Sequence, residues 1–241
     1  MQNKPILVLG SKPGSILPKI KFKKIYTANA AAERSTFYKK ISSNIDLTCI
    51  TGIKALEKDF RVRSRIIKSR PNRLIVRLPN RLIVRFKKNK LSKLFKNKCI
   101  VKPINYVDQW NFQKQFFYYP NFSLLIGELS YKENFLKKIK RLIKFIFKGN
   151  LQGVSTGFFA ILLALHENPN TNIVVCGIGM SGGGHFYKNP RNKIYNYDSR
   201  SAVDKYLINK LKKKYKLRIF SVDRDFVKIS KTKFFNNDLK I

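Results

Sequence analysis

A serine, a threonine and a glycine begin an apolar stretch of this chain, VSTGFFAILLALHE, and their side chains and backbone could bind a ligand. The hydroxyl of Ser155 or Thr156 can cap a helix, and Gly157 in its first turn lets a ligand approach the exposed backbone N–H groups. Residues 158–165 are apolar nearly all round, which predicts a buried helix. An ordinary capped core helix is the alternative interpretation, and it needs no ligand.

A glycine-rich loop follows, CGIGMSGGGHFYKNP, and it contains one of the chain's two histidines. Gly177, Gly179 and Gly182 satisfy the G-x-G-x-x-G spacing, but a dinucleotide site also requires a helix directly after the glycines, and Pro190 argues against one. We therefore reject a dinucleotide site and interpret the segment as a mobile loop or lid. In such a loop His185 can donate a hydrogen bond to a phosphate or act as an acid or base.

Short apolar runs predict the strands that would position these residues. Ile6–Leu9 leads into a turn at Gly10–Ser15, a second strand ends at Asn29, and further strands are expected at Ile45–Gly52 and Ile173–Cys176. Strands that alternate with helices favour a parallel sheet. Open sheets of this kind bind ligands at the carboxyl ends of their strands.

Net charge restricts the partners of this chain. Its 241 residues include 51 Lys and Arg against 13 Asp and Glu, a net charge of +38. Such a protein attracts polyanions, so nucleic acid, anionic lipid and phosphorylated sugars are all admissible partners. No RNP-like, zinc-finger or helix-turn-helix signature supports a nucleic-acid-binding protein.

The segment ENFLKKIKRLIKFIFKGN predicts a basic amphipathic helix, because apolar residues recur in it at helical spacing between lysines and arginines. Such a helix can lie on an anionic membrane surface. The alternative is a solvated helix that packs against the sheet. Neither interpretation gives this segment catalytic groups.

An eight-residue duplication, PNRLIVRLPNRLIVRF, occupies residues 71–86. Two copies are too few for a repeat protein, and alternation of arginine with apolar residues predicts two strands or a hairpin. Cys49, Cys99 and Cys176 are scattered without metal-ligand spacing, which favours a reducing compartment. Neither a signal-peptide pattern nor a long apolar span is present, so we expect a cytoplasmic protein, with peripheral contact to the inner membrane face as an option.

Several of these segments, in this order, resemble the sialyltransferases of glycosyltransferase family 29. VSTGFFAILLALHE with NIVVCGIG is similar to the small sialylmotif, GGHFYKN to motif III, and YDSRSAVDKYLINKLKKKYKLRIF to the very small sialylmotif. ILVLGSKPGS, YTANAA and DLTCITG look like parts of the large motif. Bacterial sialyltransferases of family 42 have a similar layout. The resemblance covers residues 4–52 weakly and 152–223 well, and the basic residues 60–148 match no motif.

The resemblance implies one Rossmann-like α/β domain over residues 1–241, a mostly parallel sheet flanked by helices, with an insertion or subdomain at about 60–148. It implies a CMP-sugar donor and neither metal nor cofactor. Positions that would bind the nucleotide, ribose or phosphate are Gly10, Ser11, Gly14, Ser15, Asn29, Ser155, Thr156, Gly157 and Tyr187. His185 matches the motif III histidine that holds the donor phosphate.

One departure from the family concerns the catalytic base. The family places a histidine five residues before an acid, and counting back from Asp204 gives Ser199. Serine cannot accept the acceptor proton without another base. Asp198 is the first candidate, provided that its surroundings raise its pKa, and His185 is the second.

The sequence therefore predicts an inverting glycosyltransferase that moves a sialic-acid-type sugar from a CMP-sugar to a glycan or glycolipid hydroxyl by direct displacement. Two alternatives stay open at this point. One is a catalytically impaired module that binds a CMP-sugar or a glycan, and the other is a basic nucleic-acid-binding protein.

Overall fold

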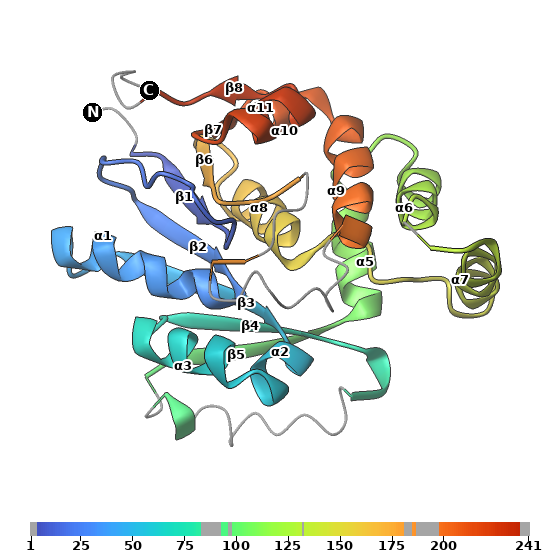
Figure 1. The fold of residues 1–241 in the computed structure, drawn as a ribbon, viewed down its shortest axis with the longest axis horizontal. Coiled ribbons are helices and arrows are strands. Elements are labelled where there is room, and N and C mark those ends of the chain that lie inside the picture. Colours follow the sequence, from blue (N-terminus) through green and yellow to red (C-terminus); the bar gives the residue numbers. More distant parts are fainter. Residues whose placement is uncertain are drawn as a thin grey trace.

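The described part of the chain forms one eight-stranded sheet in which every strand is parallel to its neighbours (Figure 1). The structure is a computed structural model that describes residues 4–82, 93–95, 98–131, 133–180, 185–186 and 198–236, without the side chains of Arg81, Asp198 and Ser199. The strand order is β5-β4-β3-β2-β1-β6-β7-β8. This arrangement confirms the predicted α/β fold with a parallel sheet flanked by helices.

The strands are β1 (Ile6–Leu9), β2 (Lys24–Ala28), β3 (Asp46–Gly52), β4 (Arg73–Leu78), β5 (Ile100–Asn105), β6 (Ile173–Cys176), β7 (Ile219–Ser221) and β8 (Lys233–Phe234). Of these, β1, β2, β3 and β6 lie close to the bounds that the apolar runs predict, and β4 lies in the first copy of the duplication. The strands β5, β7 and β8 were not predicted from the sequence. Every residue of β1 and β6 is buried, as expected of central strands that are covered on both faces.

Helices cover both faces of the sheet. The helices are α1 (Ser35–Ile41), α2 (Ile53–Lys58), α3 (Phe60–Ser69), α5 (Tyr106–Lys114), α6 (Pro120–Leu129), α7 (Phe135–Lys148), α8 (Thr156–Glu167), α9 (Asp198–Lys210), α10 (Lys213–Lys216) and α11 (Arg224–Ser230), with 3-10 turns η1 (Asn29–Arg34) and η2 (Asn80–Leu82). Successive strand residues point to opposite faces. Ile6 and Val8 therefore pack with α8 and α9, whereas Leu7 and Leu9 pack on the face that holds η1 and α1.

Only the first copy of the duplication is a strand among the described residues. β4 pairs with β3 and β5, not with the second copy. The prediction of two strands or a hairpin is wrong at residues 80–82, which form η2. Pro71 begins the first copy just as Pro79 begins the second, so the difference lies in the neighbours: β4 pairs with β3 and β5. In the second copy the Pro79 carbonyl instead accepts from the Leu82 N–H at 2.9 Å. Residues 83–86 lie outside the described chain.

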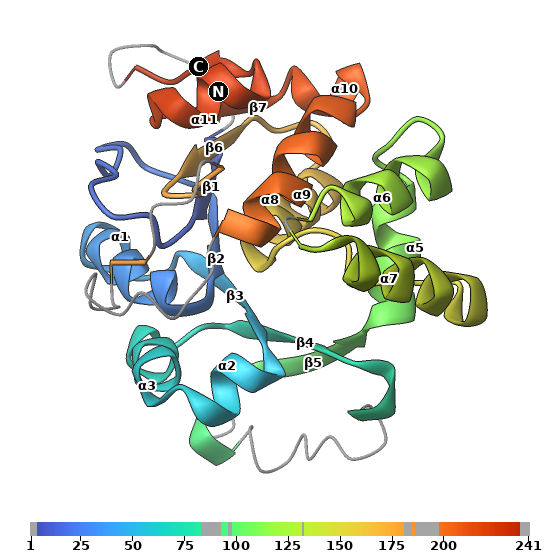
Figure 2. The same cartoon turned by 45° about the vertical axis from the view of Figure 1, so that its right-hand side comes forward.

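The basic amphipathic helix exists as predicted, but it is not part of the layers that cover the sheet. α7 lies beside α6 at one edge of the molecule (Figure 2). None of its residues is buried. In the described residues no helix is long and apolar enough to cross a membrane.

The chain reverses its direction of travel across the sheet at β1 and β6. The strands that follow β1 extend the sheet on one side, and β6 adds to the other side of β1. A glycine follows each strand, and the two backbones touch there: a Cβ on Gly10 would lie 2.1 Å from the Gly177 carbonyl oxygen. Gly177 also has a φ of +75°, which other residues rarely adopt. The Gly10 N–H donates to the Cys176 carbonyl at 2.7 Å and thus keeps the strand ends together.

We expect Gly10→Ala to lower the free energy of unfolding by at least about 2 kcal/mol, because its methyl group would overlap a backbone carbonyl that cannot move without displacing β6. Gly52→Ala is the matched control, because a Cβ there meets nothing within 4 Å. Its effect should stay within about 1 kcal/mol. Urea unfolding of both variants measures the difference. Equal stabilities would show that β1 and β6 do not approach as described.

Candidate functional site

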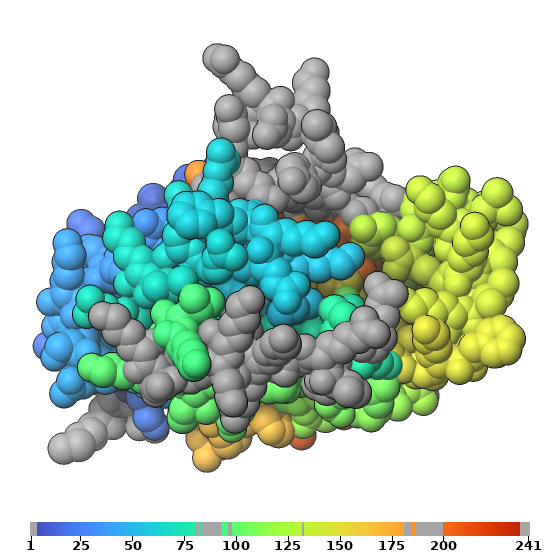
Figure 3. All heavy atoms as spheres, turned by 90° about the horizontal axis from the view of Figure 1, so that it is seen from below, coloured from blue at the N-terminus to red at the C-terminus, as the bar shows by residue number. Residues whose placement is uncertain are grey.

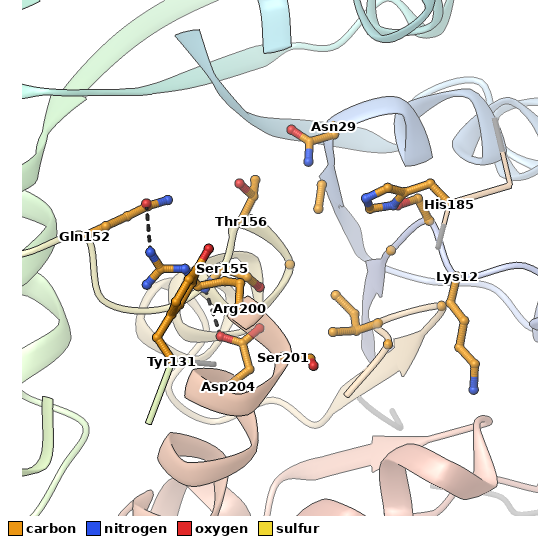
Figure 4. A pocket seen from close by; sticks show the side chains of 17 residues that line it. Lys12, Asn29, Tyr131, Gln152, Ser155, Thr156, His185, Arg200, Ser201 and Asp204 are labelled. Atoms are coloured by element: carbon orange, nitrogen blue, oxygen red, sulfur yellow. Dashed lines mark hydrogen bonds between the residues drawn. The ribbon is translucent and has the colours of Figure 1, made fainter. Parts of the chain in front are cut away.

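A pocket of about 380 Å³ lies at the carboxyl ends of β1 and β6. Its walls come from the loop after β1, the end of β2, the segment 152–157, the loop after β6, and α9. In Figure 4, His185 and Lys12 lie on one side of this pocket, and Tyr131 and Gln152 lie on the other. The reversal between neighbouring strands is where open α/β sheets bind ligands.

The N-terminus of α8 forms the floor of the pocket. Ser155 caps this helix, because its hydroxyl accepts from the Phe158 N–H at 3.2 Å. The predicted cap and the predicted burial of residues 158–165 are both confirmed. Thr156 and Gly157 follow in the first turn, whose N–H groups have no acceptor within the helix. The positive end of the helix dipole therefore faces the pocket, where it favours an anion.

A buried carboxylate of α9 contacts the same helix end. The Ser155 N–H donates to Asp204 Oδ1 at 2.8 Å, and the Asp204 side chain is only 2% exposed. Burial raises the pKa of Asp204 to about 6, although the hydrogen bonds from Ser155 and the positive charges of Arg200 and Arg77 oppose that rise. Asp204 thus combines a place in the pocket wall with a pKa near neutrality.

A buried arginine lies beneath the start of α8. The Arg77 guanidinium donates to the Val154 carbonyl at 2.8 Å and to the Thr156 hydroxyl at 3.3 Å, and it stacks 4.8 Å from the centre of the Phe159 ring. Its Nε donates to Gln109 Oε1 at 2.6 Å. Burial lowers the pKa of Arg77 to about 10, so the group stays charged at neutral pH. Its charge adds to the positive potential at the helix end.

Arg200 forms another wall of the pocket and is held by a fully buried acid. Its Nη1 lies 2.8 Å from Glu128 Oε1 and donates to the Gly153 carbonyl at 2.7 Å. Its Nη2 donates to Gln152 Oε1 at 3.1 Å, a contact that Figure 4 shows as a dashed line. The guanidinium also lies 4.9 Å from the centre of the Tyr131 ring. These contacts fix an arginine and an aromatic ring together at the pocket edge.

His185 lies on the opposite wall, against the loop after β1. Its Nδ1 shares a hydrogen bond with the Ser11 hydroxyl, and the next residue, Phe186, donates its N–H to the Ser11 carbonyl at 2.9 Å. The Phe186 ring stacks against the Arg34 guanidinium at 4.5 Å. The histidine is therefore anchored to the loop that follows β1.

Two further polar residues line this side. Asn29 has a left-handed backbone, with φ of 53°, and its Oδ1 accepts from the Thr51 hydroxyl at 3.0 Å. Lys12 pairs with Asp225 at 2.8 Å, and its backbone N–H donates to the Gly177 carbonyl at 2.8 Å. Both residues are set at strand ends, where the sheet fixes their position.

Most residues that the sequence assigns to the site meet in this pocket. Those that line it are Gly10, Ser11, Asn29, Ser155, Thr156, Gly157 and His185. Gly14 and Ser15 lie farther along the loop after β1 and are not among the lining residues. Asp198 is the first residue of α9, and its side chain lies outside the described residues, as does all of Tyr187.

The sequence did not assign several of the lining residues to the site. Lys12 lies inside the predicted turn, and Gly177 belongs to the glycine-rich loop, so their neighbourhood was a signal for both. The sequence motif uses Asp204 only to locate the position of the family's histidine and gives it no role in the site. No sequence pattern predicts that Arg200 and Tyr131 line the pocket. Arg200 is held there by Glu128, 72 residues away in the chain, and Tyr131 lies against Arg200.

No group of three or more His, Cys, Asp or Glu residues that could hold a metal ion occurs within the described ranges. No protein-family model and no curated protein matches the chain. A solved structure of the sialyltransferase CstII from Campylobacter jejuni, in complex with a substrate analogue, CMP-3FNeuAc, is similar at a TM-score of 0.46 and 13% identity, over 97% of this chain and 87% of that one. A likeness at this level carries no weight for activity.

The raised pKa of Asp204 predicts how the stability of the protein depends on pH. Above pH 6 the native state bears the cost of a buried charge, and that cost disappears as the pH falls through about 6 towards the ordinary value near 4. Asp204→Asn removes the titration and keeps an oxygen for the Ser155 N–H. Between pH 7 and 4.5 the wild type should gain about 2 kcal/mol relative to this variant. Urea unfolding at both pH values measures it, and a constant difference would contradict a pKa near 6.

Proposed function

We propose that this protein is a glycosyltransferase that moves a sialic-acid-type sugar from a CMP-sugar donor to a hydroxyl of a glycan or glycolipid. The proposal rests on the observation that residues from separate segments of the chain meet in one pocket. Seven residues that the resemblance to sialyltransferases assigns to donor binding or catalysis come from four separate segments and line one pocket. That pocket lies where the strand order reverses, which is the usual ligand position in such sheets.

The charges around the pocket fit an anionic donor. A CMP-sugar of the sialic-acid type carries a phosphate and a carboxylate. The pocket offers positive charge on two sides, from the α8 N-terminus with Arg77 and Arg200, and from Lys12, beside which His185 can donate a hydrogen bond. A volume of about 380 Å³ is within the range of small-molecule sites.

In the proposed complex the loop that begins at Gly10 and the side chain of Asn29 approach the nucleotide. The backbone N–H groups of Thr156 and Gly157, in the first turn of α8, point to the nucleotide. The Ser155 cap binds the Phe158 N–H and leaves these two groups for the ligand. His185 donates a hydrogen bond to the donor phosphate from the wall to which Ser11 holds it. Tyr187, two residues later in the chain, is the proposed aromatic neighbour of the donor.

The proposed reaction is a direct displacement. The acceptor hydroxyl oxygen bonds to the anomeric carbon of the sugar as the bond from that carbon to the phosphate oxygen breaks, and the bonding electrons leave with CMP. The acceptor proton passes to a base. We assign that role first to Asp198, which begins α9 two residues before the lining residue Arg200, and second to His185. His185 and the amides of α8 would stabilise the charge on the departing phosphate.

A second candidate is a module that binds a CMP-sugar without turning it over. Ser199 favours it, because a serine stands where the family has its base. The two candidates share the pocket and its ligand. They differ only in whether the bound donor reacts.

Nucleotide binding tests both candidates together. We expect CMP at about a hundredfold over its Kd to raise the Tm by about 5–10 °C, since a ligand that binds only the native state stabilises it. UMP, GMP and AMP should raise it much less, and the CMP shift should survive high salt. A shift that is equal for all four nucleotides and vanishes in salt would identify a general polyanion binder instead.

Variants of the two proposed catalytic groups separate transfer from binding. Asp198→Asn should lower transfer from CMP-sialic acid at least about a hundredfold while CMP affinity is kept, because only the base is lost. His185→Ala should weaken CMP binding as well, because it removes a donor to the phosphate. Asp108→Asn, in α5, and His166→Ala, whose ring packs on Phe112, are matched controls away from the pocket.

Full transfer by Asp198→Asn would move the base to another residue. CMP binding by the wild type without any transfer would favour the binding module. Normal CMP affinity in His185→Ala would remove the histidine from the phosphate site.

A further inference from the structure

The side of α7 that carries Arg141 faces the rest of the protein. Arg141 lies 2.8 Å from Glu128, which is fully buried, and it also pairs with Glu133. Its guanidinium stacks 4.2 Å from the centre of the Tyr131 ring. Phe145 lies next to Arg141 on the same side of the helix, and the centre of its ring is 5.5 Å from the centre of the Trp110 ring in α5. A buried carboxylate needs cationic partners, and among the described residues Glu128 pairs with Arg141 and Arg200.

This attachment turns the apolar side of α7 outward. At about 100° per residue, the apolar residues of α7 other than Phe145 form one stripe on the side away from Arg141. Phe147 is 82% exposed, Phe135 75% and Ile146 69%. The members of this stripe, called the α7 stripe below, are Phe135, Leu136, Ile139, Leu142, Ile143, Ile146 and Phe147. Figure 3 shows the α6–α7 region projecting at one end of the molecule.

An exposed apolar stripe of this size is ordinarily covered by a binding partner. An amphipathic helix ordinarily buries its apolar side on the core, but here seven large apolar side chains face solvent together. Lysines border the stripe. By the same helical spacing, Lys140 and Lys144 follow one edge, and Lys138 lies beyond the other. The helix is 14 residues long, or about 21 Å.

We propose that the α7 stripe docks on an anionic lipid surface, with α7 lying in the plane of the interface. Lipid headgroups supply the negative charge that the bordering lysines require, and acyl chains cover the apolar side chains. A second copy of the chain is a poor occupant, because each copy carries a net charge of +38 and repels another. Nucleic acid matches the charge but does not cover an apolar stripe.

The same contacts join the docking helix to the pocket. Glu128 binds Arg141 of α7 with one carboxylate oxygen and Arg200 of the pocket wall with the other. Tyr131 lies against both guanidinium groups. A protein docked through α7 would therefore hold its pocket in a fixed relation to the membrane. The docking proposal does not depend on which ligand the pocket binds.

Vesicle co-sedimentation of the full chain tests the proposal. The vesicles contain either phosphatidylcholine alone or phosphatidylcholine with about 30% phosphatidylglycerol. The test variant combines Leu136→Glu and Phe147→Glu in the α7 stripe. The control combines Phe60→Glu and Leu217→Glu, which replace the same residue types at other exposed positions and change the net charge equally.

We expect the wild type and the control to bind the anionic vesicles equally within about twofold, and the test variant to lose at least about tenfold in partitioning. Circular dichroism and the unfolding midpoint establish that the test variant is folded. An equal loss in both double variants would overturn the proposal, because net charge alone would then explain binding. A wild-type dimer that binds no vesicles and that the test variant makes monomeric would overturn it in favour of a second copy.

Discussion

The contact between the Gly10 and Gly177 backbones is the constraint on which the pocket depends. It brings the ends of β1 and β6 together so closely that no side chain fits between them. From the end of β1 the chain continues to Ser11, which holds His185 and Phe186. From the end of β6 it continues to Ile178, which packs against Gly157 in the first turn of α8. The close approach of β1 and β6 thus positions two walls and the floor of the pocket.

Buried charge is the second organising feature. The chain has few acids, yet Glu128, Asp204 and Asp223 are all buried around the pocket. Asp223 accepts from the Gly177 N–H at 2.6 Å, and Asp204 accepts from the Ser155 N–H. Each of these acids anchors a backbone turn that lines the site. The exterior is strongly basic because 51 Lys and Arg stand against only 13 acids, and these three buried acids fix backbone turns around the pocket.

Local patterns in the sequence were enough to predict β1, β2, β3 and β6, the Ser155 cap and the burial of α8, since each depends on neighbouring residues. They did not predict β5, β7 or β8. Convergence of these segments followed from the parallel sheet, because strand ends meet at one edge. The contacts of Glu128 with Arg141 and Arg200 join residues that are far apart in the chain, and no local pattern encodes them.

The direction in which α7 faces illustrates the same limit. Its periodicity correctly predicts an amphipathic helix, but it leaves open whether the apolar side packs on the sheet or faces a membrane surface. Its orientation is set by contacts with distant residues, those of Arg141 with Glu128 and of Phe145 with Trp110. The duplicated segment is a further case, because identical residues form a strand in the first copy but a 3-10 turn at the start of the second. Neighbouring strands available to β4, and absent from residues 80–82, account for that difference.

A crystal structure of the protein with CMP would test the central claim most directly. We predict nucleotide density between the Gly10 loop and the start of α8, with the phosphate within hydrogen-bond distance of His185 or of the first-turn amides of Thr156 and Gly157. CMP bound elsewhere, or an empty pocket at saturating CMP, would contradict the assignment of this pocket as the donor site.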